Sequence, residues 1–456
     1  MKKASLLNDY LTKYGASLKW KLCSGPLEDI QQAVVIPAYA EWEMLFETLA
    51  SVADNPASSL DRTLIISVIN NKEDASESVR ENNSKTMRTL DTLINRRFLD
   101  SFDSLNIDNS DDHSLRKIAS SRIRLGYIDA SSPGLEIPGN EGGVGMARKI
   151  GMDMALRLLR NSEDNELRLI LSLDADTRVR PDYLPEIRKA FSQRKMSTGV
   201  VSYEHQMPSD VVGLYAICAY EIFLRYWVWG LNYAGSPYTF HSIGSTIATT
   251  TEAYLSVRGM NRREAGEDFY FLNKLAKIGP VRTITGTTVY PSARISQRVP
   301  FGTGAAVEKI TSYRDQEYEL YDPGVFVILK MWLEYMQRTS YSCNAEQILV
   351  KARSIHHGLE SFLISRKFIS VWPKIQSNVK NIRACERQFH NWFDGFETLK
   401  LINDLTRKYF PKIGVIPAIR RMISLQNIEF PANLTAEHQG DILKYLRSQS
   451  MISTSH

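Results

Sequence analysis

Hydrophobic and polar positions alternate in a regular way through the first half of the chain. Apolar runs at 33–37, 64–69 and 123–128 have the length of buried strands. Between the first two runs, residues 42–52 place Leu45, Leu49 and Val52 on one face of a helix. A strand, a helix and a strand in this order predict a βαβ unit with a right-handed crossover, and therefore an α/β domain.

A fourth apolar run, 169–173, ends in two carboxylates, Asp174 and Asp176. Open α/β sheets bind their ligands at the carboxyl ends of the strands. Two acids so close together repel each other, so a cation beside them stabilises the pair, and Mg²⁺ or Mn²⁺ suits such hard oxygen ligands. The stretch therefore predicts a site for a metal-bridged phosphate ester. An Asp-x-Asp turn after a strand also occurs as ordinary loop chemistry.

The pattern continues with shorter elements as far as about residue 290. The expected elements are a helix from the glycine-rich loop 138–145 to 159, a helix from 182, strands at 198–203, 243–249, 281–284 and 287–290, and helices at 251–257 and from 266.

Two of these elements carry candidate chemistry. Glycines such as Gly145 let a backbone approach a ligand closely, and the helix start with Arg148 favours an anion. Because this loop follows the third strand, it is not a dinucleotide fingerprint, and a plain glycine turn is the alternative. Glu267 and Asp268 begin another helix, where the helix dipole also favours acids as simple capping groups.

Four regions are expected from the changes in pattern. Residues 1–30 form an N-terminal extension, 31–305 the α/β domain, and 306–456 a helical C-terminal domain without strong strand signals. Inside the α/β domain, 72–121 is rich in Asp, Ser, Asn and Glu and is expected to be a polar surface insertion. Residues 211–231 are apolar but contain two charges, which favours a buried amphipathic helix over a membrane span.

Composition narrows the class of protein. A hydrophobic share of 43% and a charged share of 23% are typical of a globular protein, and the net charge of +5 is small for 456 residues. It argues against dedicated nucleic-acid binding but leaves room for an anionic ligand or a peripheral membrane contact. Four scattered cysteines and no visible signal peptide predict a cytoplasmic protein, with a peripheral position at the inner membrane face compatible with its charge.

Taken together, the motifs resemble the family 2 glycosyltransferases of the GT-A fold over roughly residues 30–305. Five motifs carry the resemblance: Val35-Ile36-Pro37-Ala38-Tyr39 with Glu41, Asn70-Asn71, Gly143-Val144-Gly145-Met146-Ala147-Arg148, Asp174-Ala175-Asp176 (a DXD motif), and Glu267-Asp268. The resemblance implies a GT-A domain and inverting transfer from a nucleotide-sugar, usually a UDP-sugar, to an acceptor hydroxyl. By the same resemblance, the acceptor would be a saccharide, a lipid-linked acceptor or a small molecule.

The resemblance also implies a role for each matching residue. The base and ribose would be held by Pro37, Tyr39, Glu41 and Asn70, and the segment with Gly145 and Arg148 would lie near the nucleotide and diphosphate. Asp174 would contact the ribose or the metal, and Asp176 would bind the metal. The catalytic base would be supplied by Asp268 with Glu267, and Arg298 would belong to a cationic loop over the phosphates. Processive members carry Gln-x-x-Arg-Trp, whereas this chain has Gln297-Arg298-Val299-Pro300, which favours a single transfer.

Two other hypotheses use the same residues. Asp174-Ala175-Asp176-Thr177 is similar to the nucleophile motif of haloacid-dehalogenase-type phosphatases, but no Gly-Asp-x-x-x-Asp follows it. A non-catalytic GT-A-like scaffold that binds partners through its C-terminal helices would have no need of Asp176 and Asp268.

Overall fold

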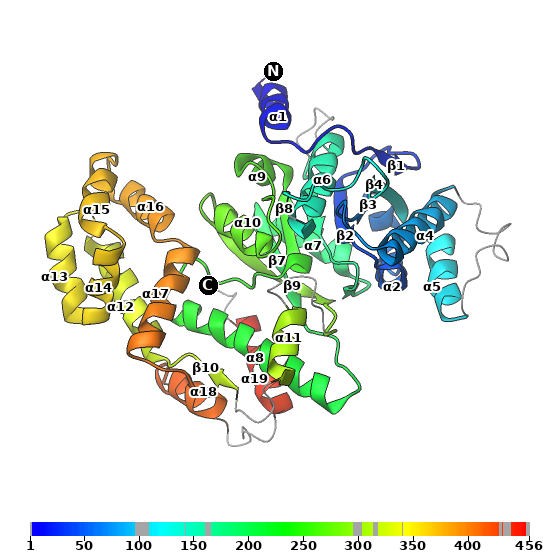
Figure 1. Ribbon diagram of the computed structural model, residues 1–456. Coiled ribbons are helices and arrows are strands. Elements are labelled where there is room, and N and C mark those ends of the chain that lie inside the picture. The colour runs from blue at the N-terminus through cyan, green and yellow to red at the C-terminus, as the bar shows by residue number, and fades with distance from the viewer. Residues whose placement is uncertain are drawn as a thin grey trace. The chain divides into compact units, whose positions relative to one another are not determined.

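The computed structural model describes residues 2–95, 109–141, 143–159, 166–294, 303–312, 318–339, 341–427, 431 and 439–452 (Figure 1). Two compact units are present. Residues 1–207 and 242–305 form the first unit, and residues 208–241 and 306–456 form the second. The segment 208–241 thus groups with the C-terminal helices, although it lies within the range 31–305 expected for the α/β domain.

A nine-stranded sheet in the order β1-β4-β3-β2-β5-β8-β7-β9-β6 forms the centre of the first unit. Its strands are β1 (Leu22–Ser24), β2 (Gln32–Ala38), β3 (Thr63–Asn70), β4 (Arg124–Ala130), β5 (Leu169–Ser172), β6 (Arg178–Val179), β7 (Thr198–Tyr203), β8 (Ile247–Thr250) and β9 (Val281–Tyr290). The longest pairings, β2 with β3, β3 with β4 and β7 with β9, are parallel. The predicted α/β class with a mostly parallel central sheet is confirmed.

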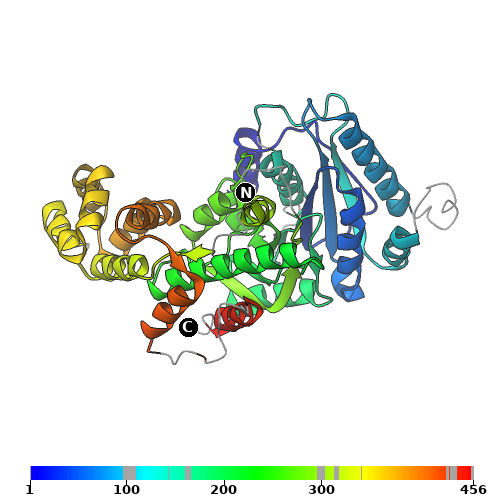
Figure 2. The same cartoon turned by 60° about the horizontal axis from the view of Figure 1, so that its bottom comes forward.

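The chain order reverses beside β2. From β2 the chain moves outward to β3 and β4, and it then returns to place β5 on the other side of β2. Right-handed crossovers therefore put α2 (Trp42–Ala53) and α4 (Glu77–Ile94) on one face of the sheet and α6 (Gly143–Leu159) on the other (Figure 2). Such a reversal leaves a crevice at the carboxyl ends of the two strands, where α/β proteins bind ligands.

The strands beside this reversal are buried along their whole length. Every residue of β2 and β3 is buried, as their uninterrupted apolar runs predict for strands covered on both faces. Helix α6 lies so close to them that a Cβ at Gly151 would stand 2.4 Å from Val35 Cγ1. A glycine is therefore required for this contact between helix and sheet.

The other helical segments of the first unit are short. They are α1 (Lys2–Lys13), α3 (Ala57–Leu60), α5 (Asn109–Ser120), α7 (Tyr183–Arg194), the 3-10 turn η3 (Gly244–Thr246), α9 (Thr251–Ser256) and α10 (Glu267–Ala276), while α11 (Thr303–Ser312) crosses the boundary between the units.

Two expectations about this unit are corrected. The range 72–121 is not a mere surface insertion, because α4 buries Leu90 and Leu93 and packs against β4. The strands expected at 281–284 and 287–290 form a single strand, β9, and a register shift between Val201 and Ser202 in its partner accommodates the irregularity.

The second unit is helical. It contains α8 (Val211–Tyr233), α12 (Gly324–Thr339), α13 (Ala345–Ile355), α14 (His357–Ser365), α15 (Phe368–Ser377), α16 (Ile382–Trp392), α17 (Gly395–Lys408), α18 (Val415–Ser424), α19 (Gln439–Ile452) and a small sheet of β10 (Glu319–Leu320) and β11 (Ile413–Gly414). Its core is rich in aromatic rings, with Trp332 in edge contact with Phe368, Phe389 and Phe393.

Helix α8 is long and apolar enough to cross a membrane by length and composition, and close to half of its most apolar stretch is buried. Its two charges are satisfied inside the unit. Glu221 accepts hydrogen bonds of 2.8 Å from Arg225 Nε and 2.9 Å from Arg447 Nε, which ties α19 to α8. Burial of a carboxylate between two guanidinium groups fits the packed helix expected from the sequence.

The N-terminal segment is anchored to α6 through one buried carboxylate. Asp153 accepts hydrogen bonds from the hydroxyls of Tyr10 (2.6 Å) and Tyr254 (2.7 Å). Its other oxygen accepts from the backbone N–H of Ala16 (2.8 Å) and lies 3.0 Å from Lys149 Nζ. Burial lowers the pKa of Lys149, and the charge of Asp153 opposes that effect. The N-terminal segment is therefore part of the first unit.

This cluster gives a test of stability. Asp153→Asn removes the countercharge of the buried Lys149, so we expect the free energy of unfolding in urea to fall by about 3 kcal/mol. The control is Arg122→Gln, which breaks the exposed ion pair of Arg122 with Asp61 and should cost less than about 1 kcal/mol. Equal losses in the two variants would contradict the anchoring role.

Candidate functional site

The candidate site lies at the carboxyl ends of β2 and β5, where the chain order reverses. After β2, the chain turns sharply at Ala40, whose φ of 50° is in the left-handed region. Asn83 on α4 holds this turn by accepting a hydrogen bond of 3.0 Å from the backbone N–H of Ala40. The turn sets the half-buried Tyr39 and the buried Glu41 beside the end of the strand.

Arg148 links three parts of the site. Its side chain is 5% exposed, and its guanidinium group forms ion pairs with Asp174 after β5 and Glu267 at the start of α10. Its Nε also donates a hydrogen bond of 3.1 Å to Ser172 Oγ. Burial alone would lower the pKa of Arg148, but the two carboxylates raise the pKa above its usual value. The residue expected near the diphosphate thus holds two acidic segments together.

The close passage of Arg148 explains a glycine. A Cβ at Gly244 would stand 2.2 Å from Arg148 Nη2. The chain accordingly forms the tight turn η3 at Gly244–Thr246 before β8, where a single strand over 243–249 is expected from the sequence.

A second arginine joins the ends of β2 and β5. Arg294 Nε lies 3.0 Å from Asp176 Oδ2, and another nitrogen of the same guanidinium group pairs with Glu41. Arg294 comes shortly after β9, from the cationic loop noted in the sequence. Arg298, also predicted to belong to this loop, lies outside the described residues.

Five carboxylates thus gather around two arginines. They are Glu41, Asp174, Asp176, Glu267 and Asp268. Burial raises the pKa of Asp176 to about 6, against the opposing charge of Arg294. An excess of negative charge that is partly relieved by raised pKa values is typical of a site that receives a cation or a proton.

Asp268 and Glu267 have different surroundings although they are neighbours. Glu267 is held by Arg148, whereas Asp268 accepts a hydrogen bond of 2.7 Å from the backbone N–H of Phe269. Burial, followed by the charge of Glu267, raises the pKa of Asp268 to about 7. Asp268 therefore has the pKa of an effective general base near neutral pH.

Backbone contacts that the sequence did not reveal fix the Asp174–Asp176 turn. Gln206 Nε2 donates hydrogen bonds to the carbonyl oxygens of Asp176 (3.0 Å) and Tyr290 (2.7 Å). Thr48 Oγ1 donates to the carbonyl of Ala175 at 2.9 Å. In the sequence, these contacts correspond only to the presence of hydrogen-bonding side chains in α2 and after β7. Such side chains are common, so they do not predict which backbone groups they bind.

Two residues predicted to bind the nucleotide make protein contacts. Asn70 Nδ2 donates a hydrogen bond of 3.1 Å to the carbonyl of Ala38 and so joins the ends of β3 and β2. A Cβ at Gly145 would lie 2.4 Å from the carbonyl oxygen of Arg263, so this glycine allows a chain segment to approach α6. Pro37 is buried within β2.

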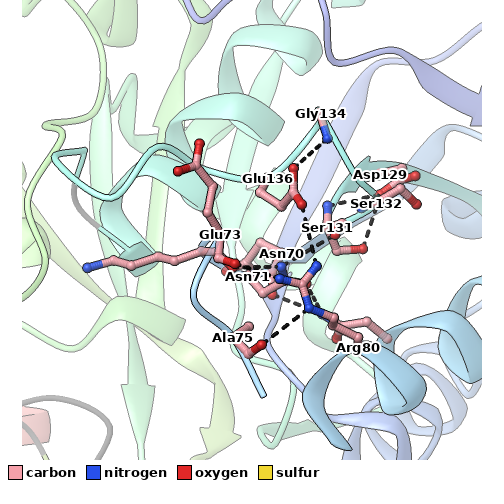
Figure 3. A network of polar contacts seen from close by, with 12 residues as sticks. Asn70, Asn71, Glu73, Ala75, Arg80, Asp129, Ser131, Ser132, Gly134 and Glu136 are labelled. Carbon is pink, nitrogen blue, oxygen red and sulfur yellow. Dashed lines mark hydrogen bonds and ion pairs between the residues drawn. The ribbon is translucent and has the colours of Figure 1, made fainter. Parts of the chain in front are cut away.

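The loops after β3 and β4 are joined by Arg80 (Figure 3). Its guanidinium group donates to the carbonyl oxygens of Glu73 (2.6 Å) and Ala75 (3.2 Å) and lies 3.4 Å from Glu136 Oε1. Glu136 in turn accepts a hydrogen bond of 2.6 Å from the backbone N–H of Gly134. These contacts hold the loops that follow β3 and β4 against the start of α4.

The residues present fit a divalent cation of a particular kind. Among the described residues, no group of three or more His, Cys, Asp or Glu side chains is arranged to hold a metal. Mg²⁺ and similar ions commonly bind through one or two carboxylates, with substrate phosphates completing the shell. Asp174 and Asp176 supply that number, so the site suits a cation that arrives with a phosphate ligand.

Gly244→Ala tests the position of Arg148. The added methyl group overlaps the guanidinium group, so we expect Arg148 to be displaced in a crystal structure and the free energy of unfolding to fall by about 2 kcal/mol. Gly25→Ala is the control, because a Cβ there meets nothing within 4 Å. An unmoved Arg148 with unchanged stability would show that the packing around Gly244 is looser than described.

Comparison with solved structures finds distant likenesses. Staphylococcus aureus TarS 1–349 is 11% identical, with 83% of this chain and 92% of that chain covered and a TM-score of 0.35. The structure of its complex with UDP-GlcNAc is 12% identical, with 93% of this chain and 89% of that chain covered and a TM-score of 0.34. The mannosyltransferase PcManGT from Pyrobaculum calidifontis, in complex with GDP-Man and Mn²⁺, is 12% identical, with 92% of this chain and 96% of that chain covered and a TM-score of 0.34. At these TM-scores the likenesses carry no conclusion about ligand or mechanism.

Sequence comparison is more decisive. No curated protein matches the chain. The model of the family described as "Glycosyl transferase family group 2" matches residues 169–393, a range that begins with β5 and includes both the Asp174–Asp176 turn and the Glu267–Asp268 pair. The family predicted from the order of the sequence motifs is thereby confirmed, and the chain is a glycosyltransferase of family group 2.

Proposed function

We propose that this enzyme transfers a single sugar from a nucleotide-sugar, in the first instance a UDP-sugar, to an acceptor hydroxyl with inversion at the anomeric carbon. One observation carries the proposal. Arg148 joins Asp174 at the strand end to Glu267 beside Asp268, and so brings a phosphate-type metal site and a separate base into one cluster. Inverting transfer needs both on opposite sides of the sugar.

In this proposal, the donor nucleotide occupies the crevice at the ends of β2, β3 and β5. Tyr39, Glu41 and Asn70 line its nucleoside end, and Asp174 and Asp176 hold a Mn²⁺ or Mg²⁺ ion. When bound, the divalent ion supplies positive charge opposite the diphosphate. Arg294, which lies at Asp176 and Glu41, adds a second positive group on the same side.

The base acts on the acceptor. Asp268 takes the proton of the acceptor hydroxyl while that oxygen forms its bond to the anomeric carbon. The bond from this carbon to the phosphate oxygen breaks, and the nucleoside diphosphate leaves with the electron pair. Glu267 stays paired with Arg148, so its role is to hold the helix start and to keep the pKa of Asp268 raised.

The contacts of Asp174 speak against the phosphatase hypothesis. A phosphatase of the haloacid-dehalogenase type uses the first acid of its motif as the nucleophile. Here Asp174 is bound to the guanidinium group of the buried Arg148, which lowers its nucleophilicity. A binding scaffold would have no use for a buried Asp268, because burial of this carboxyl disfavours its ionised form and so raises its pKa without a gain in stability.

Donor hydrolysis tests the metal site. A panel of UDP- and GDP-sugars, including UDP-GlcNAc and GDP-Man, is incubated with the enzyme and Mn²⁺, and release of nucleoside diphosphate is measured. We expect slow release that a chelator abolishes and that Asp176→Asn reduces about a hundredfold or more. Asp54→Asn, which alters an exposed acid paired with Lys117, should leave the rate unchanged. Release of inorganic phosphate from simple phosphate esters would support the phosphatase instead.

The pH dependence tests the base. Asp268 acts only when deprotonated, and its raised pKa keeps it protonated below about pH 7, so transfer should rise as pH increases toward neutrality. Asp268→Asn should slow transfer by a factor of about 10² to 10⁴ while the dissociation constant of the donor stays the same. A flat pH profile between 5 and 8 in the wild-type enzyme, with full activity in the variant, would assign the base elsewhere.

A further inference from the structure

The net positive charge of the protein is concentrated in four helices of the second unit. Residues 345–392, which contain α13 to α16, hold eight Lys and Arg against three Asp and Glu, a net charge of +5. The whole chain has a net charge of +5 as well. The remaining residues are therefore balanced overall, and α13 to α16, which lie together in Figure 1, form a basic module.

Most of these cations face solvent. Arg366 is used internally, since its Nε and Nη2 donate to the two oxygens of Glu397 at 2.6 and 2.5 Å, and Arg353 lies 3.7 Å from Glu360. The other six are exposed, and across the described part of the chain their charged groups have no acidic partner: Lys351, Lys367, Lys374, Lys380, Arg383 and Arg387. Solvent-facing cations without countercharges attract a negatively charged surface.

Exposed aliphatic side chains neighbour several of these cations in the sequence. At the corner between α14 and α15, Ile364 is 53% exposed and Ile369 is 50% exposed, with Lys367 between them. The corner is held from inside, because Phe368 is fully buried and stacks on Trp372. The two isoleucines therefore point outward from a fixed frame. Val350 on α13 and Ile382 on α16 are exposed as well, each with a basic neighbour in sequence.

We propose that the module α13–α16 docks on the surface of a bilayer that contains anionic phospholipids. Basic side chains gain attraction from the negative headgroups, and exposed aliphatic side chains beside them can enter the boundary between headgroups and acyl chains. A polyanion such as a nucleic acid or an acidic polymer would use the cations alone and would leave Ile364 and Ile369 in water. The combination therefore favours a lipid surface, and it gives a location to the peripheral membrane contact for which the net charge of the sequence leaves room.

The test measures binding of the full-length protein to vesicles by co-sedimentation. Vesicles of phosphatidylcholine are compared with vesicles of equal parts phosphatidylcholine and phosphatidylglycerol. We expect binding to the anionic vesicles only, and weaker binding at high salt because the Debye length shortens. Equal binding to both kinds of vesicle, or no binding to either, would overturn the proposal.

Two sets of variants separate the contributions. Removal of three cations, Lys351→Gln, Lys367→Gln and Lys374→Gln, and removal of the corner isoleucines, Ile364→Ser and Ile369→Ser, should each weaken vesicle binding at least tenfold. The matched controls remove the same charge and the same side-chain type from the first unit, through Lys13→Gln, Lys21→Gln and Lys195→Gln, and through Ile278→Ser. These control positions are all exposed, and their variants should bind as the wild type does.

Two further results would overturn the inference. The controls could weaken binding as much as the module variants, which would point to net charge alone. The isoleucine variant could bind as tightly as the wild type while heparin competes fully, which would point to a polyanion. If either set of variants loses its thermal transition together with binding, the single substitutions Lys367→Gln and Ile369→Ser replace that set. Unchanged vesicle binding in both single variants would overturn the inference. Donor hydrolysis, which depends on the first unit, reports separately on the proposed reaction.

Discussion

The buried guanidinium group of Arg148 is the interaction on which the candidate site depends. A cation that is 5% exposed is costly unless charged partners surround it, and Asp174 and Glu267 fill that role. These partners follow β5 and begin α10, and Arg148 itself belongs to α6. Three elements are thereby fixed against one another at a single point. Gly244 leaves the room that the guanidinium group needs.

Arg148 also divides the acids into groups with different tasks. Asp174 and Glu267 are bound to it and serve as its countercharges. Asp176 and Asp268 are not bound to it, and burial raises the pKa of each, to about 6 and about 7 respectively. Asp176 has Arg294 as its countercharge, whereas Asp268 is held by the backbone N–H of Phe269.

Sequence patterns predicted the local features well. The buried strands β2, β3 and β5 were recognisable because an uninterrupted apolar run is sufficient to define them, and Asp174 and Asp176 follow directly. The contacts of Arg148 with Asp174 and Glu267 join positions 26 and 119 residues apart, and no local pattern encodes them. Gly145 is a second example of what a local pattern cannot predict. A glycine predicts close approach, but the sequence could not tell that the approaching group is the backbone of Arg263 and not a ligand.

The charge of the cluster provides the argument for a metal ion. The five acids Glu41, Asp174, Asp176, Glu267 and Asp268 outnumber Arg148 and Arg294, the two arginines that pair with four of them, so the cluster is negative whenever these acids are ionised. In the proposed reaction, a nucleoside diphosphate would bring further negative charge to these acids and would be repelled. In the proposed reaction, Asp174 and Asp176 would hold a divalent cation, whose positive charge would oppose this repulsion. Arg294, which already pairs with Asp176, would add positive charge on the same side of the leaving phosphates.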